Sequence, residues 1–130
     1  MGWLGIMDGG LVGGVGTYIR QDFPFEFEAQ RNDMSEWLMN TGCLNVLRFD
    51  TFILVNTYFP YSNKSDEKWL RIRRQWDYEL HDFLVKLSME KPLIVCGDLN
   101  IVATDKDAWD GVSEKMQAAF CHGNTRTLMG

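Results

Sequence analysis

The stretch that decides the fold of this chain is residues 91–100, Lys-Pro-Leu-Ile-Val-Cys-Gly-Asp-Leu-Asn. Its apolar run 93–96 lies between a proline and a glycine, which predicts a strand buried on both faces in a sheet covered by helices. Asp98 and Asn100 follow this run. Ligands of open α/β folds bind just outside the carboxyl ends of the strands, so both are candidate site residues. The alternative is a plain turn, because Gly, Asp and Asn are common turn residues.

A long amphipathic helix is predicted immediately before this strand, over residues 66–89. Its apolar residues recur at helical steps, as expected for one buried face: they are Trp69, Ile72, Trp76, Leu80, Phe83, Leu84 and Leu87. Ser65 is the expected N-cap, and Lys91-Pro92 ends the helix. A second, short helix is expected over residues 113–120.

Further strands are predicted upstream of the long helix. They are expected at 15–20, at an edge position in the alternating segment 23–27, and at 44–49 and 52–58, with 30–40 as a loop. Asp50-Thr51 would connect the last two strands as a hairpin. The glycine-rich start contains neither a dinucleotide fingerprint nor a Gly-Lys-Ser/Thr phosphate loop, so it is predicted as a loop leading into strand 15–20.

A strand, a long helix and a second strand form a crossover unit. Strands 52–58 and 93–96 should therefore lie in one sheet, parallel if adjacent. Tyr58 would then sit at the strand end next to Asp98 and Asn100. Such a set suits phosphodiester hydrolysis, because an aspartate can orient and deprotonate a water and the other two can contact phosphate. Taken alone, Tyr58 is better explained as a strand-end aromatic.

Length and composition limit the classes of protein that fit. A chain of 130 residues predicts one domain, and a net charge of −5 argues against a non-specific nucleic-acid-binding module. A nucleic-acid enzyme stays open, because a metal site needs carboxylates. The 3 cysteines match no zinc or redox spacing, which favours a reducing intracellular compartment, nucleus or cytoplasm, with an organelle as the alternative. No apolar run approaches the roughly 20 residues of a membrane helix, so no membrane partner is expected.

Several charged and reactive residues can be explained by a structural role as well as by a functional one. The basic cluster of the long helix would be a phosphate-tracking face or, preferably, a solvated face with one arginine paired structurally; its members are Lys64, Lys68, Arg71, Arg73 and Arg74. His81 is expected at the surface or boundary of this helix. Cys96, inside the apolar run, is expected to behave as a small hydrophobe.

Five short motifs occur in the order found in one enzyme family. They are 13–20 (Gly-Gly-Val-Gly-Thr-Tyr-Ile-Arg), 49–60 ending in Asn-Thr-Tyr-Phe-Pro, the helix positions Arg73, Trp76, Asp77, Phe83 and Leu84, 91–100 with Gly-Asp-Leu-Asn, and 104–107 (Thr-Asp-Lys-Asp). On these motifs the chain resembles the endonuclease/exonuclease/phosphatase superfamily, and within it the exodeoxyribonuclease III-type apurinic/apyrimidinic endonucleases. The resemblance implies part of a four-layer α/β sandwich, two packed mixed sheets with outer helices, incomplete at both ends. Residues 1–130 would form a partial domain.

The same resemblance implies a DNA repair endonuclease that cleaves the phosphodiester 5′ to an abasic site with Mg²⁺ or Mn²⁺. A 3′-exonuclease or phosphodiesterase action is a further expectation. By matching position, Asp98 would activate or orient the attacking water, Asn100 would contact the phosphate and the nucleophile, and Tyr58 would contact the phosphate. Asp98, directly or through water, and Asn100 are also the metal-ligand candidates. DNA with abasic sites would be the partner of the intact protein; RNA or a small phosphorylated molecule is the alternative substrate.

The chain also departs from the family's pattern. Tyr61 stands where the family's Tyr-x-Pro-Asn motif has its asparagine, and Val12 stands where an aromatic residue is usual. The sequence contains neither the Leu-Gln-Glu segment of the metal-binding glutamate nor the Ser-Asp-His-x-Pro of the catalytic histidine; His122 lacks those neighbours. The isolated chain is therefore expected to be nearly inactive. The alternative is a non-catalytic remnant, a structural or binding module whose exposed sheet is covered by missing domain halves or a partner chain.

Overall fold

The computed structural model describes residues 2–9, 14–27, 35, 43–61 and 66–100. Its elements in chain order are β1 (Trp3–Gly9), β2 (Gly14–Arg20), β3 (Glu26–Phe27), β4 (Cys43–Arg48), β5 (Ile53–Tyr58), α2 (Glu67–Glu90) and β6 (Leu93–Asp98). Several predictions lie outside the described residues: those for Val12, Lys64, Ser65, the motif 104–107, the helix 113–120, His122 and, apart from Ser35, the loop 30–40.

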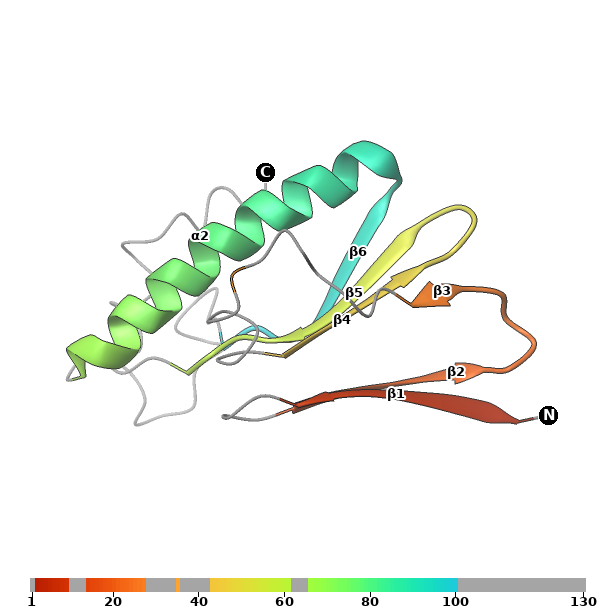
Figure 1. Ribbon diagram of the computed structural model, residues 1–130, viewed down its shortest axis with the longest axis horizontal. Coiled ribbons are helices and arrows are strands. Elements are labelled where there is room, and N and C mark those ends of the chain that lie inside the picture. The colour runs from red at the N-terminus through yellow and green to blue at the C-terminus, as the bar shows by residue number, and fades with distance from the viewer. Residues whose placement is uncertain (1, 10–13, 28–34, 36–42, 62–65, 101–130) are drawn as a thin grey trace, which may run out of the picture.

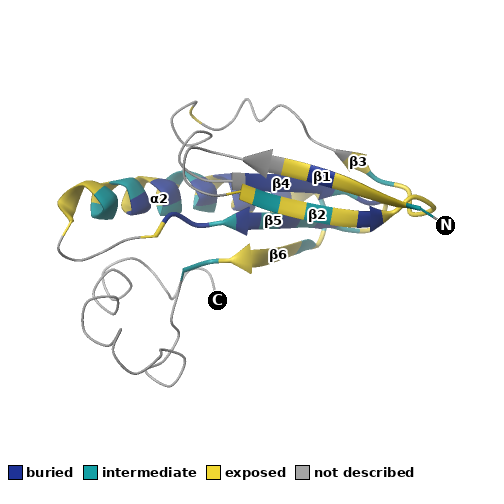
Figure 2. Ribbon diagram, turned by 90° about the horizontal axis from the view of Figure 1, so that it is seen from below, coloured by how far each residue is buried: buried dark blue, intermediate teal, exposed yellow. Residues whose placement is uncertain are grey.

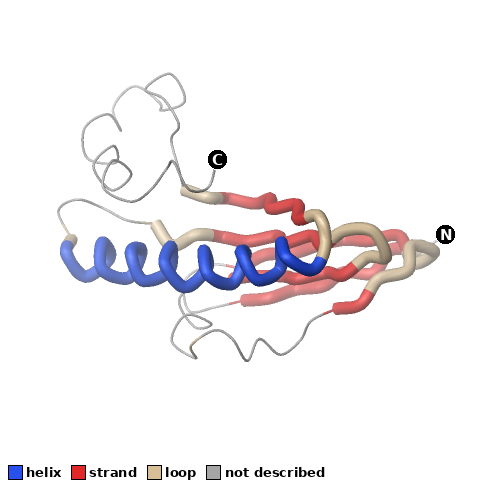
Figure 3. The backbone as a smooth tube through the Cα atoms, turned by 90° about the horizontal axis from the view of Figure 1, so that it is seen from above, coloured by secondary structure: helices blue, strands red, loops and turns tan. Residues whose placement is uncertain are grey.

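The described elements form layers. Strands β3-β4-β5-β6 make one sheet in that order, and β1 and β2 make a two-stranded antiparallel sheet. Helix α2 covers one face of the four-stranded sheet, and the β1–β2 hairpin lies on its other face (Figure 1). The helix runs along the strands rather than across them (Figure 3). The α/β class and the partial sandwich expected from the sequence are confirmed.

The central hairpin and the crossover match their predictions. Strands β4 and β5 pair antiparallel, with Val46 opposite Val55. Their connection is closed by the Phe49 amide, which donates to the Phe52 carbonyl at 2.9 Å. Strand β6 pairs with β5 in parallel, as predicted for two adjacent strands joined by a crossover helix.

Two apolar clusters fill the spaces on either side of the four-stranded sheet. The first, between α2 and the sheet, contains Leu44, Val46, Ile53, Val55, Phe59, Trp76, Leu80, Phe83, Leu84 and Leu87. The second, between the hairpin and the sheet, contains Ile6, Ile19, Leu47 and Phe49. Side chains alternate between the two faces along a strand, so neighbouring residues of β4 serve different clusters.

Helix α2 has the predicted amphipathic face, but its N-cap is a different residue from the one predicted. Asp66 is the N-cap, and its side chain accepts a hydrogen bond from the Lys68 amide at 3.1 Å. The expected cap, Ser65, lies outside the described residues. Lys91 is the C-cap, and its amide donates to the Leu87 carbonyl. The prediction that Lys91-Pro92 ends the helix is therefore confirmed.

Three predictions about strands need correction. The glycine-rich start contains strand β1, which pairs with β2 along its whole length instead of forming a loop. The edge strand expected over 23–27 is only the short β3. Strand β6 is not buried on both faces: Ile94 is 48% exposed and Val95 is 37% exposed. Within the described residues β6 is flanked by β5 alone, which leaves it open to solvent (Figure 2).

Cys96 shares the exposure of this strand. It is a free cysteine at the surface, so its expected role as a small interior hydrophobe is wrong. Desolvation by partial burial raises the pKa of its thiol, which keeps the sulfur protonated at neutral pH. Among the residues that the structure describes, no helix is both long enough and apolar enough to cross a membrane.

Candidate functional site

The ends of the parallel strands β5 and β6 bring two of the predicted site residues together. Tyr58 and Asp98, the last residues of the two strands, stand opposite each other in the register. The next residue of the chain continues the pairing, because the Phe59 amide donates to the Asp98 carbonyl at 2.9 Å. The prediction that these strand ends converge is confirmed. Asp98 is exposed and Tyr58 is half-buried, so both side chains reach the surface.

Gly97 makes this close approach of the two strands possible. Its φ of 124° lies in a region that L side chains rarely adopt. A Cβ at this position would lie 2.0 Å from the carbonyl oxygen of Thr57 in β5. Any side chain would therefore push the strand end away from β5. The glycine before Asp98 is required by packing and backbone conformation together.

Asn100 is fastened to both strand ends. Its backbone amide donates to Asp98 Oδ1 at 3.0 Å, and its side-chain Nδ2 donates to the Phe59 carbonyl at 2.7 Å. Because a carbonyl only accepts, the amide nitrogen must face Phe59, and the side-chain oxygen points away from it. The backbone of Asn100 is left-handed, with φ 48°, a conformation that asparagine tolerates better than most residues. The Asp-x-Asn segment is thus a turn and a candidate site at once.

Arg73 of helix α2 contacts the two segments that follow these strand ends. Its side chain is almost fully buried, and its Nε donates to Asp77 Oδ1 at 2.8 Å. Its two terminal nitrogens donate to the backbone carbonyls of Pro60 at 3.2 Å, Asn100 at 3.3 Å and Leu99 at 3.0 Å. The guanidinium carbon also lies 4.9 Å from the centre of the Phe59 ring, within cation–π range.

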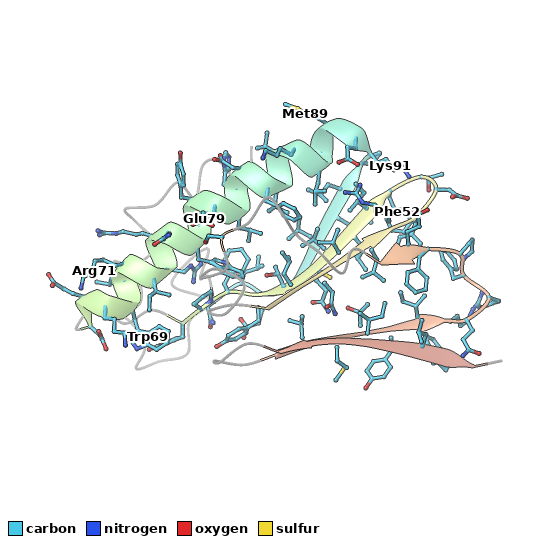
Figure 4. The ribbon with its side chains drawn as sticks, in the orientation of Figure 1. Phe52, Trp69, Arg71, Glu79, Met89 and Lys91 are labelled. Carbon is cyan, nitrogen blue, oxygen red and sulfur yellow. The ribbon has the colours of Figure 1, made fainter. Side chains whose placement is uncertain are left out.

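The sequence placed Arg73 in a basic cluster rather than in the interior. The structural pairing expected for one arginine is confirmed at Arg73. Lys68, Arg71 and Arg74 are exposed, which fits the preferred interpretation of a solvated face. Figure 4 shows Arg71 near the N-terminal end of α2. A signal for the burial of Arg73 was present: it precedes Trp76 by three positions, which puts it on the apolar side of the helix.

Asp77, the partner of Arg73, is half-buried. Burial raises the pKa of its carboxyl group above the ordinary value of 3.8, and the Arg73 guanidinium offsets only part of that rise. His81, further along the same helix, is half-buried and lies 3.5 Å from Asp82 Oδ1 through its Nδ1. This position at the boundary matches its prediction.

The strand ends supply part of the donor set that a divalent metal requires. In the described part of the chain, no group of three or more His, Cys, Asp or Glu side chains is arranged so that it could hold a metal ion. Asp98 and Asn100 offer a carboxylate and a carboxamide oxygen, the hard oxygen donors that Mg²⁺ prefers. Mg²⁺ is commonly held by one or two carboxylates and several waters, so these two residues fit part of such a site.

Comparison with known proteins places the chain in a family. Residues 3–125 match the Endonuclease/Exonuclease/phosphatase family. The chain therefore belongs to this family, as its resemblance implied.

Individual proteins of known function are also similar to parts of this chain. A DNA-(apurinic or apyrimidinic site) endonuclease of Dictyostelium discoideum is 37% identical over 62% of this chain and 23% of its own length. An enzyme of the same name from Arabidopsis thaliana is 46% identical over 46% of this chain and 16% of its own. An exodeoxyribonuclease of Bacillus subtilis (strain 168) is 29% identical over 61% of this chain and 31% of its own. The matches thus span less than a third of each of these relatives.

Proposed function

We propose that the intact protein is a DNA repair endonuclease that hydrolyses the phosphodiester 5′ to an abasic site, with 3′-exonuclease or phosphodiesterase action as a secondary activity. The observation that carries the proposal is the direct opposition of Tyr58 and Asp98 at two parallel strand ends, with Asn100 bonded to both segments. The similarity to enzymes named for apurinic or apyrimidinic sites supports the choice of substrate.

The roles of the three residues follow from their chemistry. Asp98 is exposed, and one of its oxygens is held by the Asn100 amide, which orients the carboxylate to accept a proton from an attacking water. The side-chain oxygen of Asn100 is directed away from Phe59, so it can accept a hydrogen bond from that water. The Tyr58 hydroxyl can donate to a phosphate oxygen.

Asp98 and Asn100 would also hold the Mg²⁺ or Mn²⁺ ion that the proposal requires. When bound, such an ion neutralises charge on the phosphoryl group and the leaving oxygen. With one carboxylate among these two residues, metal affinity should be weak unless another carboxylate of the intact protein contributes. For the same reason the 130-residue chain by itself should show little or no incision.

A non-catalytic binding module is the second candidate function. The exposed apolar residues Ile94 and Val95 favour it, because such residues commonly mark a surface that is covered in an assembly. A module of this kind would keep the fold and need no chemistry at Asp98. The two candidates therefore differ in the effect of changing that one residue.

The deciding experiment measures nicking of a duplex with one abasic site by the full-length protein in Mg²⁺. Asp98→Asn keeps the size and most hydrogen bonds but removes the base, and kcat should fall by about 10²–10⁴-fold. Asp82→Asn, at an exposed position of α2, is the matched control and should leave kcat unchanged. No nicking by the full-length wild type, or equal nicking by wild type and Asp98→Asn, would exclude the endonuclease.

A further inference from the structure

The buried guanidinium of Arg73 joins three parts of the molecule that are far apart in the chain. It belongs to α2, it donates to Pro60 in the segment after β5, and it donates to Leu99 and Asn100 in the segment after β6. The two segments carry the site residues Tyr58 and Asp98 at their bases. Among the described residues, the bond from the Phe59 amide to the Asp98 carbonyl is the last backbone hydrogen bond along this edge, so beyond it the ladder of β5 and β6 does not fix the positions of Pro60 and Asn100.

A continuous set of hydrogen bonds leads from Arg73 to the candidate site. Arg73 holds the Asn100 carbonyl, the Asn100 amide holds Asp98 Oδ1, and the Asn100 side chain holds the Phe59 carbonyl. Every acceptor of the terminal guanidinium nitrogens named above is a backbone carbonyl, so the contacts fix the path of the main chain. The same contacts stabilise the left-handed backbone of Asn100, a conformation that asparagine tolerates but adopts less often than the helical or extended ones.

We propose that Arg73 is a positioning residue of the candidate site, whose guanidinium fork holds the segments after β5 and β6 so that Asp98 and Asn100 keep their orientation beside Tyr58. Asp77 orients the fork through Nε. The effect on catalysis rests on the proposed function, whereas the effect on geometry does not. Arg73 is only 3% exposed, so the proposal gives it a positioning role and not a role in contact with substrate.

The contacts with both segments depend on the forked shape of the Arg73 guanidinium and not only on its positive charge. Arginine presents planar donors in fixed directions, whereas lysine offers a compact charge on a flexible stem. Arg73→Lys can keep a positive charge near Asp77 but cannot reach carbonyls on both segments at once. Arg74→Lys is the matched control, because Arg74 is the next residue of the same helix and is exposed.

The first test measures amide hydrogen exchange in the full-length protein. Arg73→Lys should raise the exchange rates of the Phe59 and Asn100 amides by about tenfold, the loss expected for one charge-assisted hydrogen bond. Amides in the β4–β5 pairing should keep their rates, and Arg74→Lys should change neither group. Equal acceleration of all amides, or no change at Phe59 and Asn100, would overturn the proposal. Should Arg73→Lys fail to fold, Asp77→Ala, which removes the acceptor of Nε alone, should give the same local pattern with a smaller change.

The second test measures nicking by the same variants. Arg73→Lys should lower kcat by about tenfold or more with KM little changed, because a misplaced catalytic carboxylate affects the chemical step more than binding. A full-length wild type without activity, combined with the local exchange pattern, would remove the proposed function and leave the positioning role in place. If the wild type is active and Arg73→Lys keeps both its kcat and its exchange rates at Phe59 and Asn100, the positioning role is excluded and the proposed function stands.

Discussion

At the scale of single residues, the segment Gly97-Asp98-Leu99-Asn100 combines two unusual backbone conformations with two polar side chains. Gly97 allows the strand end to reach the carbonyl of Thr57, and Asn100 accepts a left-handed conformation while bonding both strand ends. The residues that shape the backbone and the residues proposed for chemistry are therefore interleaved. A substitution at either kind of position should disturb the other.

The raised pKa of Asp77 should make the stability of the protein depend on pH. Its pKa is raised in the folded protein, chiefly by burial, so the folded state binds more protons than the unfolded state just above pH 3.8. Stability therefore falls as pH rises through that window up to the raised pKa. The free energy of unfolding of the wild type, measured by urea titration, should decrease relative to that of Asp77→Asn over this rise. A wild type that gains stability relative to the variant would contradict the sign.

The convergence of Tyr58, Asp98 and Asn100 could be predicted from the sequence, because parallel strands end at the same edge of a sheet. The burial of Arg73 could not be predicted with the same ease. An arginine in a run of basic residues is usually solvated, and its acceptors are main-chain carbonyls that leave no mark on the sequence. Their positions depend on how the chain leaves β5 and β6.

At the scale of elements, the regular periodicity of α2 and the β4–β5 pair made them predictable. Strand β1 was missed because glycines dilute its pattern. The structure shows how such a strand forms: the Tyr18 ring lies 3.1 Å from where a Cβ of Gly5 would be, and Met7 Sδ lies 2.8 Å from that of Gly16. Large side chains on one strand thus cover glycines on the other, a cross-strand effect that a single segment does not reveal.

The N-cap of α2 gives a prediction at this scale. Asp66→Ala removes the acceptor for the Lys68 amide and a negative charge at the positive end of the helix dipole. The variant should lose about 1 kcal/mol of unfolding free energy, measured by urea denaturation with unchanged m. Asp82→Ala, an exposed change within the helix, should stay within about 0.5 kcal/mol of the wild type. Equal losses in the two variants would show that the cap is not formed.

At the scale of the whole molecule, a polar contact joins the two sheets. Thr17 Oγ1 in β2 accepts hydrogen bonds from Asn45 Nδ2 in β4 and Asn56 Nδ2 in β5, each at 3.0 Å. The same side-chain nitrogens donate to the carbonyls of Ile6 and Gly16 in the hairpin, each at 3.1 Å. The hairpin is thus held on the sheet by directional bonds as well as by its apolar cluster.

Thr17→Val should loosen this contact between the sheets. Valine has the shape of threonine but no acceptor, which leaves two side-chain amides short of a partner, one of them on the fully buried Asn45. The variant should lose about 1–3 kcal/mol of unfolding free energy in urea titration. Thr51→Val, in the exposed turn between β4 and β5, is the control and should change little. A Thr17→Val protein as stable as the wild type would mean that these bonds contribute nothing net.

The exposure of β6 was the feature that the sequence could least predict. A run of Leu, Ile, Val and Cys indicates a strand, but its burial depends on which elements lie beside it. Within the described sheet only β5 does. Local pattern therefore predicted the type of this element and its partner, whereas the exposed fractions of Ile94 and Val95 were set by the arrangement of the whole molecule.

The pairing of β6 with β5 has a consequence for the order of folding. The β4–β5 hairpin closes through a short connection. The two strands of the β5–β6 ladder, in contrast, are separated in the chain by the whole of α2. Contacts between distant parts of a chain carry the larger loop-closure cost and tend to form late. We expect Leu93→Ala to accelerate unfolding while hardly slowing refolding, and Val46→Ala to slow refolding, in stopped-flow measurements. The strand ends that carry the candidate site would then be among the last parts of the protein to assemble.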